Sequence, residues 1–140
     1  MRIMGLDFGD KTVGVALSDP LFLNARPKEI IFRERPTKLR QTLARIEAII
    51  EEEEVSEIVL GLPLNLDGTE GERVEKTREF AEMLERRTGM PITFHDERLT
   101  TVEADEYMLK NGIKPEDRKK HVDMIAAMII LQDYLDKRNG

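Results

Sequence analysis

Three acidic positions of this 140-residue chain stand in sequence that is otherwise apolar. Asp7 interrupts a short apolar run near the N-terminus, Asp96 and Glu97 follow another, and Asp123 interrupts a longer one near the C-terminus. A buried carboxylate without a partner is costly. For any one of these acids, pairing with a nearby Lys or Arg, or capping of a backbone group, is a sufficient explanation. Their occurrence together, on separate elements, instead favours one shared site.

Carboxylates drawn from separate elements are the ligands that Mg²⁺ and Mn²⁺ prefer. Such a site supports attack of water on a phosphodiester. Side chains alternate along a strand, so Asp96 and Glu97 cannot both point into one site. We therefore predict Asp7, Glu97 and Asp123 as the catalytic and metal-binding residues, and expect Asp96 to orient Arg98 or the following turn.

The elements that must position these acids follow from hydrophobic periodicity. Strands are predicted over residues 2–8, 12–18, 28–32, 57–61 and 92–95, with a hairpin connection of three or four residues between the first two. Helices are predicted over 38–54, over a segment after 71, over a segment from the capping-box pair Thr100 and Glu103 to Asn111-Gly112, and from about 115 to about 136.

This order of elements predicts an α/β fold with a mixed five-stranded sheet flanked by helices. An antiparallel three-strand meander comes first, and βαβ crossovers follow it. In open sheets of this kind, ligands gather at the carboxyl ends of the strands, where Asp7, Asp96 and Glu97 all fall. The order is also that of the ribonuclease H-like fold, which by itself implies no function.

Composition limits the class of protein. The length suits one domain over residues 1–140, and the 40% apolar content is enough for a core. Cysteine is absent, which excludes disulfides and thiolate metal sites. We see no signal peptide and no apolar run of membrane-spanning length, and expect a cytoplasmic protein. The net charge of −6 argues only weakly against nucleic acid, because local charge decides binding.

Four sequence blocks make the interpretation more specific. They occur in the order Gly5–Gly9 with Lys11–Ala16, Val59–Asn65 with Asp67–Thr69, Asp96–Thr101, and Val122–Asp123 ahead of Ala126–Leu131. Together they resemble the YqgF family, the bacterial Holliday-junction-resolvase-like proteins, over almost the whole chain. Position 10, where many relatives carry Thr, is Asp in this chain.

The resemblance implies a ribonuclease H-like fold and metal-binding carboxylates at Asp7, Glu97 and Asp123. It also implies a nuclease that processes the 5′ end of precursor 16S ribosomal RNA, although a role in resolving DNA junctions has been proposed for the family. The loop Leu62–Gly71 then has a role beside the substrate, whereas its Pro63 and Asp67-Gly68 are equally explained as turn residues.

Several residues near these acids are candidates for binding the substrate. We predict this role for Lys11, Thr12, Asn65, Arg98, Lys119 and Lys120. For the basic members, pairing with neighbouring acids is an equally good explanation. We interpret His95 and His121 as structural or exposed, since neither forms part of a recognisable catalytic triad.

The leading hypothesis is a Mg²⁺- or Mn²⁺-dependent endonuclease acting on structured RNA, with ribosome-assembly intermediates as partners. The second is a resolvase that cuts four-way DNA junctions. A third is an RNA-binding ribosome-assembly factor that has kept the fold and lost the activity. A fourth, nucleotide binding by the glycine-containing first hairpin, is disfavoured because proteins of that type have two such lobes. The oligomeric state is left open.

Overall fold

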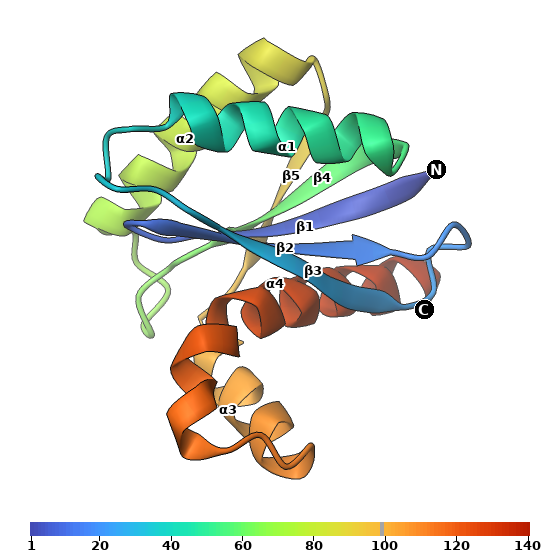
Figure 1. Cartoon of the computed structure of the whole chain (residues 1–140), viewed down its shortest axis with the longest axis vertical. Coiled ribbons are helices and arrows are strands. Elements are labelled where there is room, and N and C mark those ends of the chain that lie inside the picture. The colour runs from blue at the N-terminus through green and yellow to red at the C-terminus, as the bar shows by residue number, and fades with distance from the viewer. Residues whose placement is uncertain (99) are drawn as a thin grey trace.

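Five strands form one mixed sheet, with α1 and α2 on one face and α4 on the other (Figure 1). The computed structural model describes residues 1–98 and 100–140, without the side chains of Thr100, Thr101, Lys119 and Lys120. The elements are β1 (Arg2–Phe8), β2 (Thr12–Ser18), β3 (Ala25–Phe32), α1 (Arg40–Glu52), β4 (Val55–Leu62), α2 (Glu72–Thr88), β5 (Ile92–Asp96), α3 (Thr100–Lys110) and α4 (Pro115–Asn139).

The predicted fold class is confirmed. The strand order is β3-β2-β1-β4-β5, with β1, β2 and β3 antiparallel and β4 and β5 added in parallel. The Thr100 side chain of the predicted capping box lies outside the described residues, and Gly112, with φ +69°, follows the end of α3. None of the described helices has the length and apolar character needed to cross a membrane.

β4 begins at Val55, two residues before the predicted start, and β3 differs most from its prediction. β3 begins at Ala25, three residues before the predicted Lys28, and it includes Pro27. A proline is tolerated there because β3 is an edge strand, and the ladder shifts register between Val15 and Ala16 opposite it. The composition of residues 20–27 indicates a loop, but pairing with β2 keeps the second part of it extended.

Alternation along β1 separates the two faces of the sheet. Met4, Leu6 and Phe8 belong to the core that α1 and α2 cover. Ile3 belongs to the second core, formed with α4, and Gly5 also lies against α4. Asp7 has the parity of these last two residues, so it faces the same side as α4.

Glycines allow α4 to lie close to the strands. A Cβ on Gly5 would be 2.7 Å from Leu131 Cβ and 3.0 Å from the Ala127 carbonyl oxygen. A Cβ on Gly14 would collide with the backbone at Asp123. The backbone of α4 therefore rests directly on β1 and β2. Figure 1 shows the later turns of α4 beside the strands and its first turns beside α3.

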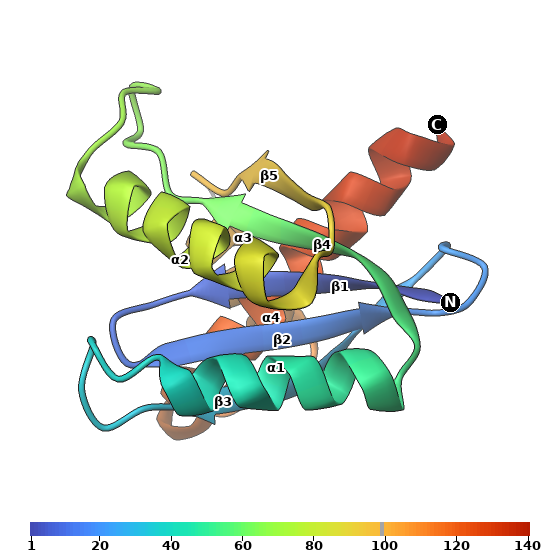
Figure 2. The same ribbon diagram turned by 90° about the horizontal axis from the view of Figure 1, so that it is seen from above.

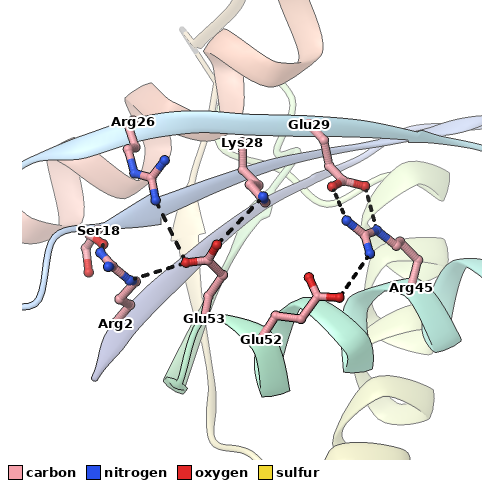
Figure 3. Close-up of polar contacts among 8 residues, drawn as sticks. All are labelled: Arg2, Ser18, Arg26, Lys28, Glu29, Arg45, Glu52 and Glu53. Atoms are coloured by element: carbon pink, nitrogen blue, oxygen red, sulfur yellow. Dashed lines mark hydrogen bonds and ion pairs between the residues drawn. The ribbon is translucent and has the colours of Figure 1, made fainter.

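A network of ion pairs lies at the end of the sheet where β1 begins (Figure 3). Glu53 forms ion pairs with Arg2 at 3.5 Å, Lys28 at 3.7 Å and Arg26 at 3.9 Å, measured from nitrogen to carboxylate oxygen. Beside it, Arg45 forms a two-point contact with Glu29 at 2.6 and 2.9 Å. These pairs connect α1 and the residue that follows it to β1 and β3.

Candidate metal centre

The three predicted acids line one cavity at the carboxyl end of the sheet. Its volume is about 300 Å³, and its lining residues are Asp7, Pro63, Leu64, Asn65, Arg73, Glu97, Arg98, Asp123 and Ala126. They come from β1, from the loop after β4, from the start of α2, from the segment after β5 and from α4. Segments distant in the sequence thus meet at the edge of the sheet where β1, β4 and β5 end.

Asp7 and Glu97 affect each other's ionisation. A hydrogen bond between their side chains lowers the pKa of Asp7 and raises that of Glu97, as expected when Glu97 is the donor. Burial, together with repulsion from Asp7, raises the pKa of Glu97 to about 9. Burial raises the pKa of Asp7 to about 6, although the hydrogen bond from Glu97 opposes this change, and Asp123 adds repulsion. The pair therefore retains a proton that exposed carboxyls lose well below neutral pH.

Asp123 reaches the cavity from α4 and is held by Thr12. The Thr12 hydroxyl donates a hydrogen bond of 2.7 Å to Asp123 Oδ2. Thr12 is itself fixed by the β1–β2 turn, where the Gly9 N–H donates to the Thr12 carbonyl at 2.8 Å. Because α4 rests on Gly14, Asp123 lies beside this hairpin. The sequence-based prediction gave Thr12 a substrate-binding role, whereas in the structure its hydroxyl orients an acid.

Glu97 is aimed into the cavity by the end of β5. Its N–H donates to the Leu62 carbonyl at 3.2 Å, which holds the residue beside the end of β4. Its side chain lies over Gly61, where a Cβ would be only 2.8 Å from Glu97 Cδ. The predicted role of Asp96 agrees with its contacts, since Asp96 accepts from the Arg98 N–H at 3.0 Å and from Arg98 Nε at 2.8 Å.

The donor set fits a hard divalent cation. Asp7 and Glu97, whose pKa values burial raises, line one cavity with a third acid, so carboxylate oxygens are available there to a cation that displaces their protons. Among the residues that the structure describes, however, no three acidic or histidine side chains already form a group with metal-binding geometry. Asp7 and Glu97 would hold the ion first, and Asp123 is the third available ligand.

The five predicted substrate-binding residues other than Thr12 divide into three groups. Asn65 and Arg98 line the cavity, although the Arg98 guanidinium already contacts Asp96 and the Leu66 carbonyl. Lys11 is exposed in the β1–β2 turn and is not part of the cavity wall. The side chains of Lys119 and Lys120 lie outside the described residues.

Arg73 is a candidate that the sequence reasoning missed. It lies in the first turn of α2, lines the cavity, and its positive charge lowers the pKa of both Asp7 and Glu97. On the same helix Lys76 pairs with Glu72 and Arg78 with Glu70, whereas Arg73 forms no ion pair with any described residue. No local pattern distinguishes it from these neighbours, because only the fold brings the start of α2 to β1 and β5.

With this geometry established, comparison with known proteins identifies the family. The family model of RuvX, described as Holliday junction resolvase, matches residues 1–137. The chain belongs to the RuvX family. The predicted resemblance to the YqgF proteins is thereby confirmed.

RuvX relatives align along nearly their whole length. A protein of Agathobacter rectalis is 62% identical over 97% of this chain and 95% of its own length, and one of Lachnospira eligens is 56% identical over 99% of both. Each bears the name "Putative pre-16S rRNA nuclease".

Solved structures extend the comparison of the fold. The fowlpox virus Holliday junction resolvase bound to junction DNA has a TM-score of 0.61 at 11% identity, with both chains fully covered. The Thermus thermophilus RuvC complex with a junction has a TM-score of 0.56 at 15% identity, covering 100% of this chain and 96% of the other. At such identities the likeness concerns the ribonuclease H-like fold.

Proposed function

We propose that this RuvX chain is a divalent-metal-dependent endonuclease that cuts structured RNA, with the 5′ end of precursor 16S ribosomal RNA as its substrate. The observation that carries the proposal is the meeting of Asp7, Glu97 and Asp123, from three separate segments, in one cavity that two arginines also line. The names of the RuvX relatives support the choice of RNA. Ribosome-assembly intermediates in the cytoplasm would then be the partners.

Asp7, Glu97 and Asp123 would hold Mg²⁺ or Mn²⁺. When bound, the ion activates water and stabilises the oxygen that leaves the scissile phosphorus. Glu97 gives up its proton when the cation arrives, so binding of the ion weakens as the pH falls. Thr12 keeps Asp123 from turning away, because its hydroxyl occupies one carboxylate oxygen.

Arg73 and Arg98 supply the positive charge of the site, and Asn65 supplies an amide. Arg98 is oriented by Asp96, and Arg73 lacks an ion-pair partner among the described residues. Arginine is well suited to two-point contacts with a phosphate. These groups would bind the phosphodiester backbone, with Arg73 directed at the phosphate nearest the acids.

The decisive assay is cleavage of a precursor 16S RNA fragment by wild type and by Asp7→Asn, each with Mg²⁺ or Mn²⁺. We expect a loss of roughly 100-fold or more, because the change removes an anionic ligand that stabilises charge in the transition state. Asp105→Asn is the matched control, an exposed aspartate on α3 away from the cavity, and should cleave normally. Equal cleavage by all three proteins would overturn the site assignment.

A four-way DNA junction in the same assay tests the second function, which the description of the family model favours. Cleavage of the junction without cleavage of the RNA would replace the proposed substrate. Failure to cleave either one, together with calorimetry showing no uptake of Mg²⁺ or Mn²⁺ with or without RNA, would favour the inactive assembly factor.

A further inference from the structure

A second cavity lies on the opposite face of the sheet from the acids, at the same end. Its lining residues come from the end of β1, from the segment between β3 and α1, and from α1 and α2. Figure 2 shows these two helices side by side on one face of the sheet. The volume of the cavity is about 550 Å³, compared with about 300 Å³ for the acidic cavity. Its lining residues are Phe8, Asp10, Arg33, Pro36, Thr37, Leu39, Arg40, Leu43, Lys76, Glu79, Met83 and Arg87.

The wall of this cavity has the chemistry of a base-binding surface. Phe80 and Phe8 stack with their ring centroids 4.2 Å apart, and the Arg33 guanidinium lies 4.7 Å from the Phe8 ring centroid. The stack thus ends on a guanidinium that lines the cavity. Unpaired bases stack on aromatic rings and on arginine planes. Leu43 and Met83 add apolar surface to the same wall.

Arg33 is held in place by the hairpin that carries Asp7. Its side chain is buried, with Nη2 donating to the carbonyl oxygens of Gly9 and of Asp10, the latter at 2.7 Å, and its N–H donates to the Lys11 carbonyl at 2.8 Å. Nη1 has no partner among the described residues. The planar group is therefore fixed without ion pairing.

The rim of the cavity carries one basic side chain that is exposed and outside any ion pair among the described residues. Four basic side chains line it against the two acids Asp10 and Glu79. Lys76 and Arg87 already pair with Glu72 and Glu47, whereas Arg40, at the start of α1, forms no ion pair with any described residue. Arg40 is exposed and available to an anion.

We propose that this cavity binds one unpaired nucleotide of the nucleic-acid substrate, with its base against Arg33 and the apolar side chains of Leu43 and Met83, and its phosphate at Arg40. The inference rests on the proposed nuclease function. Asp7 and Phe8 are consecutive in β1, so the acidic site and this cavity lie on opposite faces of the sheet at the same end. A nucleic-acid strand that runs from one site to the other would pass the Gly9–Lys11 turn and its exposed Lys11. The basic segment between β3 and α1, which the acidic site does not use, then serves the same substrate.

Methionine-methyl NMR tests the site directly. Of the seven methionines, Met83 lines this cavity and Met108 lies in the core formed with α4, so their methyl signals report on different faces. Uridine monophosphate and adenosine monophosphate should shift the Met83 signal and leave Met108 unchanged. Uridine alone and inorganic phosphate alone should shift the Met83 signal only at concentrations at least tenfold higher, because uridine lacks the phosphate that contacts Arg40 and phosphate lacks the base. An unchanged Met83 signal, or an equal response to phosphate alone, would overturn the proposal.

Charge reversal provides the matched variants. Arg40→Glu should weaken nucleotide binding at Met83, and binding of single-stranded RNA, by roughly tenfold or more, because a charged hydrogen bond is lost. Arg86→Glu makes the same change on an exposed part of α2 outside the cavity and should bind as wild type does. Equal weakening by both variants would show a general charge effect and would contradict a defined site.

The active-site variant separates this inference from the function on which it rests. Asp7→Asn leaves every residue that lines the second cavity intact. It should therefore keep the nucleotide response of Met83 while losing cleavage. If Asp7→Asn cleaves normally and its Met83 signal still responds to nucleotide, the metal site alone is overturned. If the wild type cleaves normally but its Met83 signal does not respond to nucleotide, the nucleotide site alone is overturned.

Discussion

Glu53 and Glu97 are two glutamates beside the same sheet, in opposite electrostatic surroundings. Glu53, near the start of β1, contacts Arg2, Arg26 and Lys28 (Figure 3). Glu97, near the end of β1, contacts Asp7, and repulsion from two aspartates raises its pKa further. The first glutamate is neutralised by this chain's own cations. The second is kept protonated by its acidic neighbours, and a bound cation would take the place of that proton.

The difference shows that the acids of the ion-pair network and those of the candidate metal centre are distinguished by where the cations lie. The chain has 22 Lys and Arg for 28 Asp and Glu, and it places three cations around a partly exposed surface acid. Around the Asp7–Glu97 pair, Arg73 is the one cation whose charge lowers both pKa values among the described residues. Substitutions at Glu97 and at Glu53 test the two surroundings separately, and substitutions at Gly14 and Thr12 test how Asp123 is placed beside the first of them.

The largest effect is expected from Gly14→Ala. The added methyl group meets the backbone of α4 at Asp123, which cannot give way as a flexible side chain does. We expect the free energy of unfolding to fall by roughly 3 kcal/mol or more, measured by urea denaturation. A variant that keeps wild-type stability would show that α4 does not rest on β2. Ser18→Ala, also on β2, is the comparison variant, because it removes one buried hydrogen bond, from the Ile3 N–H to Ser18 Oγ, without adding an atom.

Glu97→Gln should stabilise the metal-free protein at alkaline pH. The folded-state pKa of Glu97, about 9, lies above its ordinary value of 4.5, so the folded state binds this proton more tightly than the unfolded state. Stability of the wild type is therefore highest below about pH 4.5 for this group and declines as the pH rises toward 9. An uncharged glutamine at this position should remove the decline, a gain of roughly 1–3 kcal/mol at pH 8.

Thermal unfolding with and without Mg²⁺ or Mn²⁺ checks this prediction. The ion should raise the wild-type melting temperature more at pH 8 than at pH 6, since protons compete with it. Glu97→Gln should lose most of that response. A response equal to that of the wild type would contradict the assignment of Glu97 as a ligand.

Thr12→Val should reduce cleavage with little change in stability. The variant keeps the shape of the residue and loses the 2.7 Å hydrogen bond to Asp123. We expect a loss of roughly tenfold in kcat with a stability change of about 1 kcal/mol. Thr12→Ser retains the hydroxyl and should restore kcat. Rescue by serine separates positioning of the acid from packing, and equal loss in both variants would reject the positioning role.

The smallest effect is expected from Glu53→Gln, the counterpart of Glu97→Gln in the ion-pair network. Because its contacts are partly exposed, the variant should lose about 1 kcal/mol or less, and less still in high salt. Its sign is opposite to that expected at Glu97. A stabilising effect of Glu53→Gln, measured at pH 8 in low salt, would remove the contrast between the two glutamates.

The sequence alone determined the elements and singled out the acids as candidates. Alternation along residues 2–8 and 12–18 and the helical spacing within 38–54 are local properties, so the order of strands and helices and the mixed sheet were predicted correctly, although β3 and β4 begin earlier than predicted. Asp7, Glu97 and Asp123 stood out because a charge within an apolar run is costly wherever the chain places it.

Only the tertiary structure decided what surrounds those acids. Arg73, Gly14 and Gly61 carry no local signal, since an arginine on a helix and a glycine in a strand are ordinary until another element approaches them. Thr12 was predicted as a substrate contact and is the hydrogen-bond donor to Asp123, 111 residues away along the chain. The stack of Arg33 on Phe8 and Phe80 likewise joins three elements. Pairing, proton sharing and cavity shape depend on distances between segments, and folding sets those distances.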